Sequence, residues 1–145
     1  MSRGAERADH LIEEFSKVSN WEERYEKIIM MGKDLPPMDE SLKTESNKVK
    51  GCQSQVWLST EFKDGNVIFY ADSDASIAKG IIALLLSIYS ELTPEEILQT
   101  PTEFLEKLGL RQHLSMSRAN GLASMLKQIT FYAIAFQKKA ELGLI

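Results

Sequence analysis

Cysteine and histidine are scarce in this chain of 145 residues, which contains one cysteine, Cys52, and two histidines, His10 and His113. A single cysteine excludes an internal disulfide. With only two histidines beside it, no ligand set for zinc or an iron–sulfur cluster stands out, and the spacing of the carboxylates does not suggest one. We therefore expect no bound metal.

The chain also lacks a basic stripe and a long apolar run. Its formal net charge is −4, and the lysines and arginines are spread along the sequence, so we expect no nucleic acid as a partner. The longest apolar run, GIIALLLSIYS from Gly80, is too short to cross about 30 Å of hydrocarbon. The charged N-terminus shows no apolar segment followed by a cleavage site. We expect no membrane association and a cytoplasmic location.

The chain is predicted to form one domain, residues 1–145. Its fold class is α/β in the α+β form, with helices covering a small antiparallel sheet. Its 43% of hydrophobic residues are enough for a core without disulfides or metal. Apolar residues at helical spacing predict two N-terminal helices, a strongly buried helix and a long last helix. These patterns lie in residues 11–18, 21–29, 77–88 and 122–136.

Capping signals bound these helices. Asn20 with Glu23 predicts the start of the second helix, and Gly32 with the pair Pro36–Pro37 predicts its end. Ser73 or Asp74 is the expected N-cap of the buried helix. Two capping boxes, Thr93–Glu96 and Thr100–Glu103, predict two short helices, the second ending at Gly109, and we assign them no chemistry.

A hairpin is predicted between residues 56 and 71. Residues 56–62 alternate between apolar and polar, KDGN supplies a turn at Asp64–Gly65, and residues 67–71 form a second apolar run. Because a lone hairpin is marginally stable, we expect a third strand from residues 47–50.

Cys52 lies in the stretch VKGCQSQVWL, directly before this hairpin. Gly51 permits a turn, and the polar residues Gln53, Ser54 and Gln55 follow the thiol, so Cys52 is expected in a loop. A free cysteine is either a small buried apolar residue or a reactive group. The polar loop, with Lys48 and Lys50 upstream to favour the thiolate, makes the reactive interpretation equally reasonable.

Two further residues invite a functional interpretation. Arg118 lies in the first turn of the last helix, which begins at Ser115 or Ser117, and a cation there opposes the helix dipole. Either a structural salt bridge or an anionic group that Arg118 binds must compensate. His113 precedes this helix and could serve as a general base for Cys52, although no spacing argument brings the two together.

Four ordered blocks resemble the SufE family of sulfur acceptors, which work with cysteine desulfurases in iron–sulfur cluster assembly. They are NWEERYEKIIMMGKDLP, VKGCQSQVWL, DSDASIAKGIIALLL and LGLRQHLSMSRANGL. The resemblance extends from about Leu11 to about Ile134 and is closest to the branch that acts in the Suf system. One departure is Ala71, where we would expect glycine.

The resemblance implies a SufE/IscU-like fold and a function. Cys52 matches the family's sulfur-accepting cysteine, which takes persulfide sulfur from a SufS-type desulfurase, stimulates its turnover and passes sulfur to a downstream Suf scaffold complex. The chain is then not an enzyme and binds no cofactor, because PLP is on the partner. Gly51, Gln53, Asp74 and Arg118 are the loop or partner-binding candidates that accompany the thiol. Monomer and homodimer both remain open.

Two other functions compete with this one. A stand-alone hydrolase would use Cys52 as its nucleophile with His113 as the base. A bare interaction module would have an incidental Cys52, so replacing that residue would leave its activity intact. A single cysteine favours the first function, that of a sulfur carrier, because a second thiol nearby would resolve a persulfide into a disulfide and release sulfide.

Overall fold

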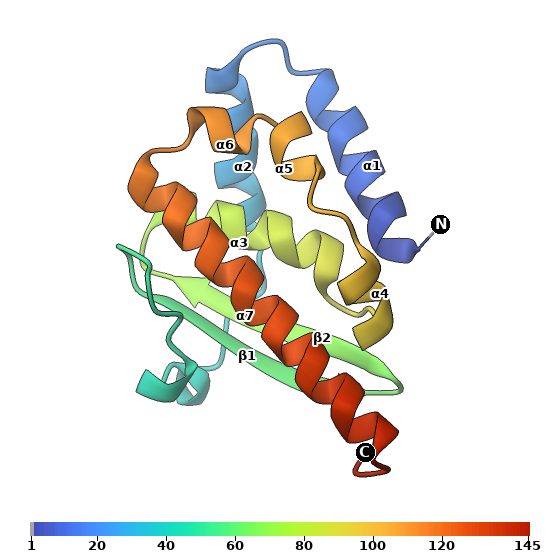
Figure 1. Cartoon of the computed structure of the whole chain (residues 1–145). Coiled ribbons are helices and arrows are strands. Elements are labelled where there is room, and N and C mark those ends of the chain that lie inside the picture. Colours follow the sequence, from blue (N-terminus) through green and yellow to red (C-terminus); the bar gives the residue numbers. More distant parts are fainter. Residues whose placement is uncertain (1) are drawn as a thin grey trace.

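The structure, a computed structural model, describes residues 2–145 and confirms a small antiparallel sheet covered by helices (Figure 1). Two 3-10 helices, η1 and η2, precede the single hairpin. The elements in order are α1 (Arg3–Ser16), α2 (Trp21–Lys33), η1 (Glu40–Leu42), η2 (Glu45–Asn47), β1 (Val56–Lys63), β2 (Asn66–Ser73), α3 (Ser76–Tyr89), α4 (Pro94–Gln99), α5 (Phe104–Lys107), α6 (Leu110–His113) and α7 (Met116–Glu141).

Helix α3 lies at the centre of the fold because its sequence leaves almost no polar face. Most of its side chains are buried, and Leu84, Leu85 and Ile88 are fully inaccessible to solvent. It packs between α2 and the hairpin, and α1 and α7 also contact it (Figure 1). The prediction that this helix is strongly buried is therefore confirmed.

Two glycines allow α2 and α3 to approach each other closely. A Cβ added to Gly80 would lie 2.3 Å from the carbonyl oxygen of Ile28, and one added to Gly32 would lie 2.7 Å from the backbone nitrogen of Gly80. The second helix ends before Pro36 and Pro37 as predicted, but Gly32 does not end it, because α2 continues to Lys33 and Asp34 is its cap. Gly32 serves the contact between the two helices instead.

The hairpin forms as predicted, with Val56 opposite Ser73 and Lys63 opposite Asn66. Asp64 and Gly65 both have positive φ, 53° and 82°, as a tight hairpin turn requires. The expected third strand is reduced to one bridge, in which Lys48 pairs with Trp57. Helix η2 ends at Asn47 and the chain turns at Gly51, so too little extended backbone remains between them for a strand.

Most capping predictions are confirmed. The Asn20 side chain accepts a hydrogen bond from the Glu23 amide at 2.8 Å, and Thr93 forms the expected capping box with Glu96. Gly109 adopts a left-handed φ of 78° after α5. Ser115, one of the two candidates, caps α7.

Two further capping predictions are wrong. Thr100 is buried, and its hydroxyl donates to the Glu96 carbonyl at 2.7 Å, so it completes α4 and does not start α5, which begins at Phe104. The N-cap of α3 is Ala75. The Asp74 carboxylate does not cap α3, because it accepts a hydrogen bond from the Gln55 amide in the loop before β1.

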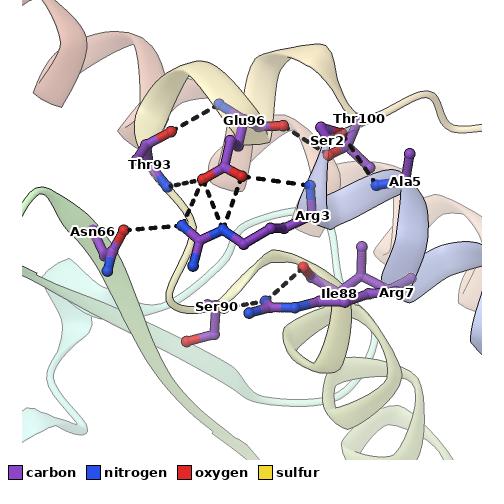
Figure 2. Close-up of polar contacts among 10 residues, drawn as sticks. All are labelled: Ser2, Arg3, Ala5, Arg7, Asn66, Ile88, Ser90, Thr93, Glu96 and Thr100. Carbon is purple, nitrogen blue, oxygen red and sulfur yellow. Dashed lines mark hydrogen bonds and ion pairs between the residues drawn. The ribbon is translucent and has the colours of Figure 1, made fainter.

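Glu96 also joins α4 to the N-terminus of α1 (Figure 2). The Arg3 guanidinium donates to both carboxylate oxygens of Glu96, with Nη2–Oε1 at 2.6 Å and Nε–Oε2 at 2.9 Å. Glu96 Oε1 also accepts from the Thr93 amide at 3.2 Å. In the next turn of α1, Arg7 donates to the carbonyls of Ile88 and Ser90 at 3.1 and 2.6 Å. Arg7 therefore holds α1 against the end of α3, and Arg3 holds it against α4.

Glu96→Gln is expected to lower the melting temperature by a few degrees at pH 7, because it removes the charge that Arg3 binds. The Arg3 guanidinium lowers the pKa of Glu96 from 4.5 to about 2. A carboxyl whose pKa is lowered on folding stabilises the protein above its unfolded-state pKa. The difference between wild type and variant should therefore be constant above about pH 5 and vanish as the pH falls from 4.5 to about 2.

The measurement is thermal unfolding of both proteins between pH 7 and pH 2. Glu95→Gln is the matched control, since Glu95 is an exposed neighbour in the same turn and should show no such dependence. A difference between Glu96→Gln and wild type that persisted unchanged at pH 2 would contradict the proposed role of the charge.

Candidate functional site

Cys52 lies on the loop between Lys48 and Val56, which packs against α7. Gly51 has a φ of 88°, and a Cβ at this position would lie 2.6 Å from the Ser124 hydroxyl oxygen. Glycine therefore meets two requirements here, a left-handed turn and close contact with α7. The Cys52 thiol points to the same helix, where its Sγ lies 3.8 Å from the Gly121 carbonyl as a weak hydrogen-bond donor.

The thiol borders a small, mostly apolar cavity of about 110 Å³. Gln53 and Ser54 line it beside Cys52, and Arg118 lines it from the first turn of α7. The remaining lining residues come from β1, α3 and its preceding residue, and α7: Val56, Ala75, Ile77, Ala78, Ile81, Ile82, Ser117, Gly121, Leu122 and Met125. Cys52 is half-buried, so the fold shields it partly from bulk water.

Burial raises the pKa of the Cys52 thiol above its ordinary value of 9.0. Within residues 2–145 no cation offsets this effect, so the expectation that Lys48 and Lys50 favour the thiolate is wrong for this conformation of the loop. A buried thiol is a poor nucleophile because the thiolate is the reactive form. We therefore expect Cys52 to react faster when the loop leaves the cavity or when a partner changes its surroundings.

Asp74 fastens the other end of the loop. Its carboxylate Oδ1 accepts a hydrogen bond from the Gln55 amide at 3.0 Å, and its own amide donates to the Gln55 carbonyl at 3.3 Å. Asp72, two residues earlier, instead pairs with Lys43 at 2.9 Å and Lys79 at 3.3 Å. Asp74 thus links the loop carrying Cys52 to the β2–α3 connection, a contact that its sequence position alone does not reveal.

Arg118 has no carboxylate partner within 4.0 Å in the described part of the chain. Its backbone amide donates to the Ser115 hydroxyl that caps α7. Its guanidinium donates to the Tyr25 hydroxyl and lies 5.9 Å from the centre of the Tyr25 ring. Tyrosine is uncharged, so this contact does not neutralise the positive charge of Arg118. The structural salt bridge is therefore not formed in the described chain, and a cation borders the cavity beside the thiol.

His113 does not approach the thiol in a way that supports acid–base catalysis. Its ring stacks on Trp21, with 4.3 Å between ring centres and planes 17° apart, and it does not line the cavity. The only hydrogen-bond partner of Cys52 among residues 2–145 is the Gly121 carbonyl. The Cys52–His113 dyad that a hydrolase would need is therefore not formed.

Several contacts at the site were not predicted from the sequence. Tyr25, Ser124 and Gly121 all touch candidate residues, and each is far from its partner in the chain. Among the described residues there is no cluster of three or more metal-binding side chains. Over the same residues no helix combines the length and apolar character that a membrane crossing requires.

Gly51→Ala is expected to increase the rate of Cys52 alkylation about tenfold or more. A left-handed conformation costs a non-glycine residue about 1–2 kcal/mol, and about 1.4 kcal/mol changes a population tenfold. The added methyl group also collides with Ser124, so both effects favour a displaced loop. Stopped-flow or mass-spectrometric alkylation with iodoacetamide at pH 8 measures this.

Gly65→Ala is the matched control, because Gly65 has a similar φ of 82° but nothing lies within 4 Å of its added Cβ. It should alkylate at the wild-type rate. Equal rates for Gly51→Ala and wild type would show that the loop does not limit access to the thiol.

Comparison with known proteins gives three similarities. A family model described as "SufE: Fe-S metabolism associated domain" matches residues 9–133. An uncharacterised SufE-like protein of Synechocystis sp. is 42% identical over 133 residues, which cover 92% of this chain and 84% of that protein. The solution structure of a hypothetical protein from Thermus thermophilus has a TM-score of 0.74 at 21% identity, covering 89% of this chain and 94% of the other, and shows the fold alone.

Proposed function

This chain belongs to the SufE family, and from that membership we propose that Cys52 accepts sulfur from a PLP-dependent cysteine desulfurase. The family is associated with Fe–S metabolism, which supports a sulfur-transfer protein over an enzyme of the ordinary kind. In our proposal it also stimulates turnover of a SufS-type desulfurase. Sulfur then passes from Cys52 to a downstream Suf scaffold complex, and PLP stays on the desulfurase.

The transfer step needs no external oxidant or reductant. The desulfurase carries a persulfide, Cys–S–SH, on its own cysteine. The Cys52 thiolate attacks the outer sulfur, the S–S bond of the partner breaks, and the partner's cysteine leaves as a thiolate. A Cys52 persulfide forms, and the proton lost by Cys52 balances the one that the partner's thiolate takes up.

The observation that best supports this proposal is the placement of the only thiol. Cys52 lies half-buried over an apolar cavity on a loop fastened at Gly51 and Asp74. Such a loop shelters the sulfur between encounters and needs only a few contacts broken to extend it. In addition, the chain has no second cysteine that could convert the persulfide into an internal disulfide.

The other candidate residues have roles that follow from their contacts. Gly51 permits the turn that seats the thiol, and Asp74 holds the loop in its resting position. Gln53 lies beside the thiol in the cavity lining. Arg118 provides a positive charge that would attract the anionic persulfide sulfur once it forms.

The test is intact-protein mass spectrometry after incubation with a PLP cysteine desulfurase and L-cysteine. We expect a gain of about one sulfur, roughly 32 Da, that dithiothreitol removes. Chain pretreated with N-ethylmaleimide is the control and should gain nothing. Absence of the adduct with a desulfurase that is active on cysteine would overturn the proposal.

A further inference from the structure

A groove beside the Cys52 loop is lined by three lysines and no carboxylate. We call it the lysine groove, and its lining residues are Ser46, Lys48, Val49, Lys50, Ser124, Lys127 and Gln128. Lys50 is two residues before Cys52, and Ser124 is the residue whose hydroxyl faces Gly51. The groove is thus formed by the segment that leads into the thiol loop and by the part of α7 against which that loop packs.

The sequence around the groove is depleted of acidic residues in a protein that is acidic overall. The chain has 21 aspartates and glutamates against 17 lysines and arginines. None of those acidic residues lies between Glu45 and Glu61, or between Glu106 and Glu141. The first of these stretches contains the Cys52 loop, and the second contains nearly all of α7. The fold therefore brings two acid-free stretches together around the thiol.

Two of the three lysines have charges that nothing in the described chain neutralises. Lys48 pairs with Glu45, with Nζ–Oε1 at 2.8 Å. Lys50 and Lys127 are exposed, and neither has a carboxylate within 4.0 Å among residues 2–145. Arg118, equally unpaired, borders the cavity on which Cys52 lies. The thiol loop is therefore accompanied by cations that are free to meet an external negative charge.

We propose that the lysine groove docks an acidic surface of the cysteine desulfurase that supplies sulfur to Cys52, an inference that rests on the proposed function. Exposed lysine ammonium groups on flexible stems can pair with carboxylates on a facing protein surface. Complementary charge accelerates encounter and sets orientation more than it adds affinity. Placed beside Lys50, such a contact would bring the partner's cysteine to the loop that carries Cys52.

The test measures binding of the purified SufS-type desulfurase of the same organism to three variants over a range of salt concentrations. Lys50→Glu/Lys127→Glu should weaken binding about tenfold at low salt, because two attractive contacts become repulsive. Lys50→Arg/Lys127→Arg keeps both charges and should bind like wild type. Lys17→Glu/Lys63→Glu makes the same change in net charge at exposed sites, on the residue after α1 and at the hairpin turn, and should also bind like wild type.

The persulfide assay on the same samples separates the two proposals. In one outcome, binding depends on salt and on Lys50 and Lys127, but wild-type Cys52 gains no sulfur. This outcome would support the docking surface and overturn the carrier function. Normal sulfur loading with binding indifferent to salt and to both lysines would overturn the docking surface and leave the carrier function standing. Equal weakening by the distal control variant would also overturn the inference, because only net charge would then matter.

Discussion

Cys52→Ser is expected to gain no sulfur at all from a desulfurase that loads the wild-type chain. A serine hydroxyl is neither appreciably ionised at neutral pH nor able to form the S–S bond that stores the transferred sulfur. The substitution replaces sulfur by a slightly smaller oxygen at a half-buried site, so the fold should persist. Intact mass and the rate of alanine release by the desulfurase are measured together.

The two measurements discriminate between the competing functions. A sulfur acceptor predicts that Cys52→Ser loses both the adduct and the acceleration of alanine release. Retained acceleration without an adduct would indicate an activator that works through binding alone. An activity of the chain that is unchanged in Cys52→Ser would show that the cysteine is incidental. Unfolding of wild type and variant in urea verifies that both are folded.

Gly80→Ala is expected to reduce the free energy of unfolding by about 2–4 kcal/mol. Alanine favours a helix over glycine by about 1 kcal/mol, which alone would stabilise α3. However, the new Cβ would lie 2.3 Å from the carbonyl oxygen of Ile28, a backbone atom that cannot move without displacing α2. Overpacking between two rigid helices should outweigh the gain in propensity. Urea unfolding followed by circular dichroism measures the difference.

Gly65→Ala again provides the control. Its added methyl group meets no atom within 4 Å, so only the left-handed φ of 82° opposes it. It should cost about 1–2 kcal/mol, less than Gly80→Ala although Gly80 lies in a regular helix. If Gly80→Ala stabilised the protein, the α2–α3 contact would have to be less tight than the structure shows.

Local signals in the sequence predicted the fold well. Asn20, Thr93 and Ser115 each form a hydrogen bond within three residues, so the pattern that predicts the cap contains the whole interaction. The hairpin turn is equally local, because Asp64 and Gly65 tolerate positive φ. The central position of α3 could also be predicted from its own sequence, because the helix has almost no polar face to present to water.

Predictions failed where a residue is used by a distant segment. Gly32 carried a correct local signal, but it contacts another helix. Thr100 failed for a local reason, because its hydroxyl donates to the carbonyl of Glu96, four residues earlier, and completes the preceding helix. Asp74 was a plausible N-cap, yet its carboxylate binds Gln55, 19 residues away. No pattern within a short window of the sequence contains the partners of Gly32 and Asp74.

The candidate site was predicted in its parts and not in its arrangement. Cys52 and its loop are evident because a lone thiol between glycine and amides is unusual. Its burial against Gly121 depends on α7 crossing the loop, which only tertiary packing decides. For Arg118 the sequence left two alternatives, and within the described chain its guanidinium contacts the Tyr25 hydroxyl and no carboxylate.

The single bridges that flank the hairpin have a consequence for solubility at high concentration. On the outer side of β2, the Val67 amide donates to the Leu92 carbonyl at 2.7 Å and the Phe69 amide donates to the Ser90 hydroxyl at 3.0 Å. On the outer side of β1, the Val56 carbonyl accepts from the Val49 amide at 2.8 Å. Exposed strand edges are templates for pairing with other chains and for aggregation. Here short segments of the same chain occupy part of both edges, so less of each edge is available for pairing with strands from neighbouring molecules.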